Sequence, residues 1–224
     1  MKGASDLVFL FDVDNTLLDN DRVTADLFKR LDDVGGTQAR KRYKEIFEKL
    51  RQELGYADYL GALERYRLED LHDPKILEIA NWLIDYPFPK RLFPRTLEVV
   101  RRAKRWGQAV ILSDGDAVFQ PRKIARSGLW KAFGGEVLIF IHKEQMLGDV
   151  ERMYPARHYV VVDDKLRILE AIKNQWEDRV TTVFPKQGHY ANDAKALVSY
   201  RPADVSVARI GEILKLERAD LARA

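Results

Sequence analysis

The chain has 224 residues, of which 46% are hydrophobic and 33% are charged, as expected for a globular protein that can bury a sizeable core. It contains no cysteine, which excludes disulfides, thiolate nucleophiles and cysteine metal sites. The formal net charge of +3 is too small to indicate nucleic-acid binding, and no apolar stretch approaches membrane-spanning length.

Five apolar runs predict buried strands, because strands covered on both faces read as continuous rather than alternating apolar sequence. These runs are residues 7–13, 108–113, 136–141, 158–164 and 179–184. Amphipathic helical patterns follow at 96–106, 121–133, 143–154, 166–176 and in the tail 207–224. This alternation predicts an α/β fold with a doubly wound parallel sheet, a Rossmann-like core with helices on both faces.

Residues 20–89 interrupt this alternation. The segment shows no predicted strand, only charged helical sequence such as "ARKRYKEIFEKLRQEL", and it is too long for a loop in a compact domain. The prolines of "YPFPKRLFP" (86–94) mark the return to the core, since proline disfavours helix continuation. We therefore predict a Rossmann-like core of residues 1–19 and 90–224, with residues 20–89 inserted as a helical domain.

Polar residues cluster after the predicted strands, at the carboxyl edge where open parallel sheets form their ligand sites. Following strands one to four in turn, they are Asp12 and Asp14, Ser113 and Asp114, Lys143, and Asp163 and Asp164. Burying carboxylates is costly unless a partner offsets their charge, and a set of oxygen ligands favours Mg²⁺. The sequence therefore predicts a Mg²⁺ site at this edge of the sheet.

In order and approximate spacing, these residues resemble the four motifs of the haloacid dehalogenase superfamily. The motifs are "DVDNT" (12–16), Ser113, Lys143 and the acid pair 163–164. The resemblance covers the whole core, and the 20–89 insertion sits where many members carry a helical cap domain. It implies a hydrolase of the phosphatase-like branch, with Mg²⁺ as cofactor and a small phosphorylated metabolite as substrate.

The resemblance also implies roles for the acids. Asp12 would be the nucleophile that attacks phosphorus to form an aspartyl-phosphate, which water then hydrolyses. Asp14 would be the general acid for the leaving oxygen and then the base for the incoming water. The Asp12 carboxylate, the Asp14 backbone carbonyl and Asp164 would hold the metal, with Asp163 assisting.

Four further positions would bind the phosphoryl group. By resemblance, Ser113 and Lys143 hold its oxygens, and backbone N–H groups near Asn15 and Asp114 complete the cradle. Lys123 competes with Lys143 for the lysine position. We expect Lys123 on a solvated helix face and assign the role to Lys143.

Three features depart from the family pattern or stand beside it. Many relatives have proline after the motif lysine, where this chain has Glu144, and a small residue after the acid pair, where it has Lys165. A lysine beside the metal acids could compete with Mg²⁺ or tune it. The segment 184–193, with a glycine, a histidine and a tyrosine, could line the mouth of the site, although loop chemistry explains its composition equally well.

Asp14 favours one reaction over another, because a leaving halide needs no proton whereas a leaving alkoxide does. We therefore expect a Mg²⁺-dependent phosphatase rather than a dehalogenase. Phosphoryl transfer to an alcohol, as in a phosphomutase, uses the same residues, and a non-catalytic binding module of this fold would have lost a motif residue. We expect a cytoplasmic protein that binds neither nucleic acid nor membranes, and the sequence leaves its substrate and oligomeric state open.

Overall fold

A single parallel sheet organises the protein, in a computed structural model that describes residues 5–222. Residues 1–4 of the predicted core and 223–224 of the predicted tail helix lie outside the described residues. The sheet has the strand order β3-β2-β1-β4-β5-β6. The strands are β1 (Ser5–Phe11), β2 (Gln108–Asp114), β3 (Val137–Phe140), β4 (Ala156–Val162), β5 (Val180–Pro185) and β6 (Val205–Val207). This order confirms the predicted Rossmann-like sheet. From β1 the chain adds β2 and β3 on one side, and it then adds β4, β5 and β6 on the other, so the strand order reverses between β1 and β4.

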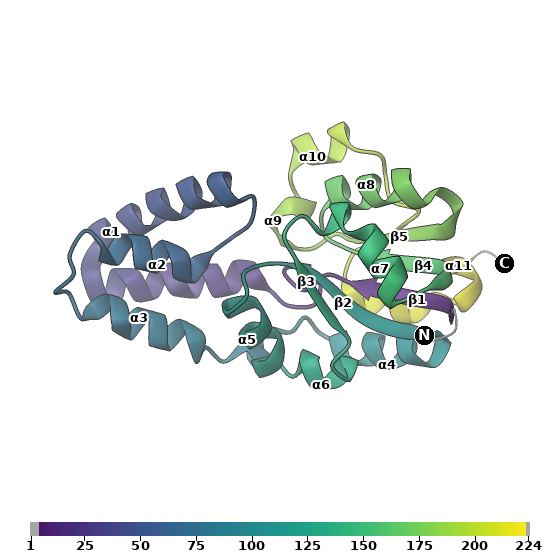
Figure 1. Cartoon of the computed structure of the whole chain (residues 1–224), viewed down its shortest axis with the longest axis horizontal. Helices are drawn as coiled ribbons and strands as arrows, with labels where there is room; N and C mark the ends of the chain where they lie inside the picture. Colours follow the sequence, from purple (N-terminus) through teal and green to yellow (C-terminus); the bar gives the residue numbers. More distant parts are fainter. Residues whose placement is uncertain (1–4, 223–224) are drawn as a thin grey trace.

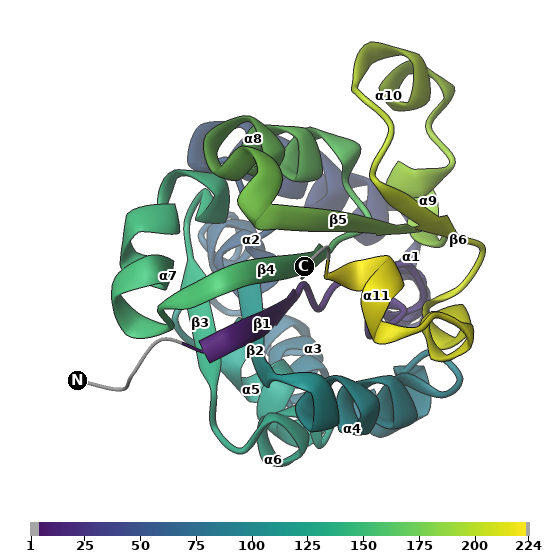
Figure 2. The ribbon, with the colours of Figure 1, turned by 90° about the vertical axis from the view of Figure 1, so that its right-hand side faces the viewer.

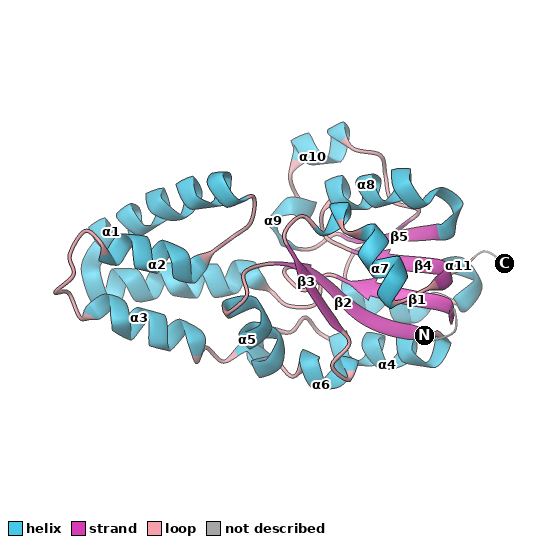
Figure 3. Ribbon diagram, in the orientation of Figure 1, coloured by secondary structure: helices cyan, strands magenta, loops and turns pink. Residues whose placement is uncertain are grey.

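Helices surround the sheet and extend from one end of it (Figure 3). The α-helices are α1 (Asn20–Leu54), α2 (Tyr59–Arg67), α3 (Lys75–Ile84), α4 (Thr96–Trp106), α5 (Phe119–Arg126), α6 (Leu129–Phe133), α7 (Leu147–Met153), α8 (Leu166–Trp176), α9 (Gly188–Ala191), α10 (Ala194–Ser199) and α11 (Arg218–Leu221). Short 3-10 turns are Phe88–Arg91, Lys143–Gln145, Glu177–Arg179 and Ile210–Lys215. Among the described helices, none combines the length and apolarity that a membrane crossing requires.

Strand β1 shows how both faces of the sheet come to be buried. Alternate residues of a strand point to opposite faces. Phe9 and Phe11 belong to one apolar cluster, together with α4, α5 and α6, whereas Val8 and Leu10 belong to the other, together with α7 and α8. Figure 2 shows these two groups of helices on opposite sides of the sheet. The continuous apolar sequence of β1 thus reflects burial on both faces.

Helices α1, α2 and α3, which we call the helical segment, lie together beyond the carboxyl ends of the strands (Figure 1). Helix α1 is interrupted at Gly36, whose φ of 76° and ψ of 176° are not helical. Its residues Leu27 and Leu31, and Tyr59 of α2, are buried in the same apolar cluster as Phe11. The helical segment therefore packs onto the sheet region through a continuous core, and its separation into a domain stays a prediction.

The structure corrects the predicted helix at 207–224. Val207 is instead the last residue of β6, which pairs with β5. The backbone N–H of Ile210 donates to Gln187 Oε1 at 3.0 Å, and a 3-10 turn and the short α11 follow. Pairing with β5 and Gln187 thus supplies the backbone hydrogen bonds that a helix would otherwise have supplied.

The predicted helices at 121–133 and 143–154 are each divided in two. Gly128, with φ of 85°, separates α5 from α6, and only glycine adopts this left-handed conformation without steric cost. The second helix starts as a 3-10 turn at Lys143–Gln145 and becomes α-helical at Leu147.

Two glycines provide a matched test of the close packing around β1. A Cβ at Gly107 would overlap the carbonyl oxygen of Leu7, whereas a Cβ at Gly148, inside α7, would meet no described heavy atom within 4 Å. Gly107→Ala is therefore expected to lower the free energy of unfolding by about 1–3 kcal/mol. Gly148→Ala should raise it by about 0.5–1 kcal/mol, because alanine favours the helix. Urea unfolding checks both values, and equal effects of the two substitutions would contradict the packing of β1 against Gly107.

Candidate active site

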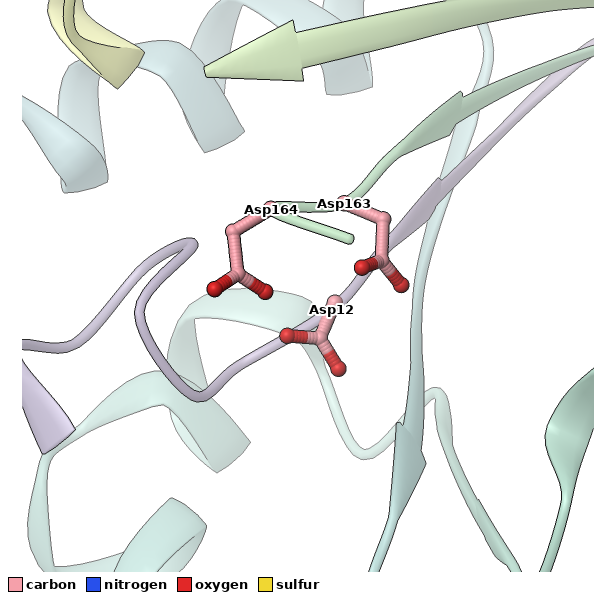
Figure 4. Close-up of side chains that lie close together, drawn as sticks. All are labelled: Asp12, Asp163 and Asp164. Atoms are coloured by element: carbon pink, nitrogen blue, oxygen red, sulfur yellow. The ribbon is translucent and has the colours of Figure 1, made fainter. Parts of the chain in front are cut away.

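The first residues after β1 and β4 bring three carboxylates together where the strand order reverses. The backbone N–H of Asp12 donates to Val162 O at 2.9 Å, and that of Asp163 donates to Val183 O at 3.2 Å. These bonds continue the pairing of the sheet and hold both residues at its edge. One oxygen from each of Asp12, Asp163 and Asp164 lies within 4.8 Å of the others. Figure 4 shows the three side chains lying close together.

The electrostatic cost of this cluster is high, because all three carboxyl groups are buried. Burial raises the pKa of Asp163 to about 6. Burial, and then the neighbouring charge of Asp163, raises the pKa of Asp164 well above its usual range. Asp12 Oδ2 and both carboxylate oxygens of Asp164 have no hydrogen-bond partner among the described residues. Unpartnered buried carboxylate oxygens of this kind fit a divalent cation with oxygen ligands.

Lys143 neutralises part of the cluster. Its Nζ lies 2.6 Å from Asp12 Oδ1 and 2.6 Å from Asp163 Oδ2, and it donates to Leu112 O at 3.2 Å. Burial alone would lower the pKa of Lys143, but the charges of Asp12 and Asp163 raise it beyond its usual range. The ammonium group is therefore charged. It contacts Asp12 and Asp163 directly but not Asp164.

The turn after β1 is held by its own polar groups. Asn15 has a φ of 60°, and its Oδ1 accepts the N–H groups of Asn20 and Asp21 at 3.0 and 3.1 Å. Its own N–H donates to Leu18 O at 2.7 Å, so this group, expected in the phosphoryl cradle, is already bonded inside the turn. Thr16 Oγ1 accepts the N–H of Asp164 at 3.1 Å and thereby joins this turn to the end of β4.

Lys123 does not lie on a solvated helix face, contrary to the expectation from sequence. Its side chain is 1% exposed, and Nζ donates to Asp14 Oδ1 at 2.7 Å and to Asp14 Oδ2 at 2.8 Å. The turn after β1 places the Asp14 carboxylate opposite the inner face of α5, and this meeting supplies the counter-charge that allows a lysine to be buried. Sequence analysis missed this contact because it joins residues that are distant in the chain.

Ser113 and Asp114, at the end of β2, face different partners. The buried Ser113 hydroxyl accepts Gln120 Nε2 at 2.9 Å. The Asp114 carboxylate accepts the backbone N–H of Lys143 at 2.8 Å and so holds the turn that carries that lysine. Asp114 therefore contacts the site through its side chain, whereas the sequence predicted a role for its backbone N–H.

A cavity of about 600 Å³ opens between the carboxyl edge of the sheet and the helical segment. Asp14, Asp114 and Lys165 line it from the sheet side. Arg51, Tyr56 and Tyr59 line it from the helical segment, and His189 and Tyr190 line it from α9. The segment 184–193 thus does reach the mouth of the site, which its composition left open. A second cavity, of about 590 Å³ and lined by residues such as Arg95 and Arg209, has none of the predicted site residues in its wall, whereas Asp14, Asn15 and Asp114 line the first. The three clustered acids are among the lining residues of neither cavity.

Lys165 belongs to the wall of this cavity. Its Nζ lies 4.9 Å from the centroid of the Tyr190 ring, a cation–π arrangement. Burial would lower its pKa, but the charges of Asp164 and Asp12 raise it beyond its usual range. Lys165 therefore adds positive charge near the acid cluster while its ammonium group rests against an aromatic ring.

Comparison with known proteins agrees with this arrangement. A family profile described as haloacid dehalogenase-like hydrolase matches residues 7–175. A protein from Burkholderia xenovorans LB400, classed as a haloacid dehalogenase-like hydrolase, is 59% identical, with a TM-score of 0.92 over 96% of this chain and 98% of that one. Among curated proteins, none matches the chain.

Two more distant structures share the fold. YfnB from Bacillus subtilis, a HAD-hydrolase solved bound to magnesium, is 15% identical, with a TM-score of 0.64 over 94% of this chain and 97% of that one. L-2-haloacid dehalogenase from Xanthobacter autotrophicus is 18% identical, with a TM-score of 0.63 over 93% of this chain and 97% of that one. At these identities the likeness concerns the fold alone.

The acid cluster predicts how Mg²⁺ affects thermal stability. Mg²⁺ should raise the melting temperature of the wild-type protein, since an ion that binds only the folded state stabilises it by about 2.7 kcal/mol at 100 times its Kd. Asp164→Asn should abolish this rise and, without metal, should melt no lower than the wild type, because it removes a buried charge.

Differential scanning calorimetry with and without Mg²⁺ measures this effect. Asp178→Asn, at an exposed position of the Glu177–Arg179 turn, is the matched control and should respond like the wild type. A full Mg²⁺ response in Asp164→Asn would show that the ion binds elsewhere.

Proposed function

The chain belongs to the haloacid dehalogenase-like hydrolases, and we propose that it is a Mg²⁺-dependent hydrolase of a small phosphate monoester. The observation that carries the proposal is the position of Asp14, two residues after Asp12 and in the wall of the cavity. A carboxyl group at this point can give a proton to the oxygen that leaves phosphorus. The acid cluster beside it offers the oxygen ligands that Mg²⁺ prefers.

Asp12 has the environment of a nucleophile. Lys143 holds its Oδ1 at 2.6 Å, while Oδ2 has no hydrogen-bond partner among the described residues. In the first step an Asp12 oxygen forms a bond to phosphorus, and the bond from phosphorus to the ester oxygen breaks. The product is an aspartyl-phosphate and a free alcohol.

Asp14 handles the protons of both steps. It gives a proton to the ester oxygen as that oxygen leaves, and it then takes a proton from the water that attacks the phosphorus of the aspartyl-phosphate. The second step releases inorganic phosphate and restores the Asp12 carboxylate. Asp14 therefore ends the first step without its proton and regains one in the second, ready for the next turnover.

Asp12, Asp163 and Asp164, with the Asp14 carbonyl, are the groups that would hold Mg²⁺. When bound, the ion supplies positive charge that offsets the carboxylates and the phosphoryl oxygens. Magnesium bound to YfnB, a protein of similar fold, supports this assignment. Lys143 is this chain's own cation beside Asp12, and we assign it and Ser113 to the phosphoryl oxygens.

The helical segment would act as a cap over the substrate. It supplies Arg51, Tyr56 and Tyr59 to the cavity wall, while the sheet edge supplies Asp14 and Asp114. Such an arrangement separates substrate recognition from chemistry and limits the entry of water during the first step. The cavity volume of about 600 Å³ suits a small phosphorylated metabolite.

Dehalogenation is the less favoured reaction. A halide leaves without a proton, so it would give the ion pair of Asp14 with the buried Lys123 no role. Phosphoryl transfer to an alcohol would use the same residues as hydrolysis. Release of inorganic phosphate in the absence of an acceptor alcohol separates these two outcomes.

Asp12→Asn tests the proposal with a panel of phosphate monoesters that includes p-nitrophenyl phosphate. The wild type is expected to release inorganic phosphate only with Mg²⁺, and EDTA should stop the reaction. Asp12→Asn should lower kcat/KM by at least about 10³-fold, because the nucleophile is lost. Asp178→Asn should leave kcat/KM unchanged. A wild-type chain that is folded, binds Mg²⁺ and turns over none of the panel would contradict the proposal.

A further inference from the structure

Lys123 forms a buried polar cluster with Asp14 and Asn20. Its Nζ donates to both carboxylate oxygens of Asp14 and, at 3.1 Å, to Asn20 Oδ1. An ammonium group has three donors, so these three acceptors satisfy it completely. The Phe119 and Tyr59 rings lie 5.3 and 5.9 Å from Nζ and shield it from water.

This cluster constrains the carboxyl group of Asp14. The Asp14 side chain is 26% exposed and lines the cavity, whereas the lysine that grips it is 1% exposed. Each carboxylate oxygen can accept more than one hydrogen bond, so contacts with Lys123 leave lone pairs available on the side that lines the cavity. Lys123 thus fixes the direction of the carboxyl group.

We infer that Lys123 is a positioning residue that aims the Asp14 carboxyl group at the leaving oxygen of the substrate, an inference that rests on the proposed function. A general acid is effective only when it lies within hydrogen-bond reach of the atom that it protonates. Without Lys123 the carboxyl group loses two donors and can rotate away. Lys123 thereby determines how poor a leaving group the enzyme can expel.

The cluster also connects the groups that orient Asp14 to the helical segment. Asn20 is the first residue of α1, and its Nδ2 donates to the Tyr59 hydroxyl of α2 at 2.9 Å. The same hydroxyl lies 2.8 Å from Thr24 Oγ1. Tyr59 lines the cavity, so hydrogen bonds connect the groups that orient Asp14 to the wall that faces the substrate.

Two substrates with different leaving groups test this inference. p-Nitrophenolate leaves with little need for a proton, whereas the alkoxide of a simple alkyl phosphate needs one. In Lys123→Met, kcat/KM should fall by about 10²-fold or more for the alkyl phosphate and by less than about 10-fold for p-nitrophenyl phosphate. This parameter ends at alcohol release, so it excludes the later attack of water. Lys131→Met, at an exposed lysine of the neighbouring α6, should change neither value.

A double substitution separates positioning from a merely structural role. In an Asp14→Asn background, adding Lys123→Met should leave the ratio of the two kcat/KM values unchanged, because no general acid remains to be aimed. If Lys123→Met does not fold, Asn20→Ala removes one acceptor of the ammonium group and should shift the ratio in the same direction by a smaller factor.

Equal losses on the two substrates, in whichever variant folds, would overturn the role of Lys123 while leaving the proposed function intact. A wild type that hydrolyses none of the phosphate monoesters of the panel, from which the two substrates are drawn, would instead remove the proposed function and this inference with it.

Discussion

Three carboxylates buried at the reversal of the strand order are the constraint on which the site depends. Because β1 and β4 are neighbours in the sheet, the residues that follow them are forced together, and burial raises the pKa of both Asp163 and Asp164. Lys143 offsets the charges of Asp12 and Asp163, which leaves the oxygens of Asp164 without a described donor. Under the proposed function, a divalent cation would supply the missing charge, which is also the charge that phosphoryl transfer requires.

Asp12 and Asp14 are held by two different lysines. Lys143 follows β3 and grips Asp12, whereas Lys123 lies on α5, after β2, and grips Asp14. The two carboxylates, which are the nucleophile and the proton carrier of the proposed function, are therefore oriented separately, although only Val13 stands between them in the chain. Gln187 adds a further anchor, since its Nε2 donates to the carbonyl of Thr16 at 2.7 Å. The proposed chemistry thus depends on a short turn that the surrounding elements hold from several sides.

Much of this fold was predictable from sequence, because β1 to β5 are continuous apolar runs with polar residues after them. The edge strand β6 was missed, since three residues carry too little pattern, and the helix predicted for the tail was wrong because Val207 and Ile210 bond to β5 and Gln187. The meeting of the strand-end acids followed from the topology of parallel sheets. The burial of Lys123 did not, because a helical lysine shows no sign in the sequence of the distant carboxylate that pairs with it.

The most direct measurement of the central claim is the chemical identity of the intermediate. The protein, mixed with Mg²⁺ and a phosphate monoester and quenched in acid during turnover, can be digested and analysed by mass spectrometry. The account predicts one phosphoryl group on the peptide that contains Asp12, convertible by borohydride reduction to homoserine at that position. A phosphoryl group on another residue, or turnover with no phosphorylated peptide even at the shortest quench times, would contradict it.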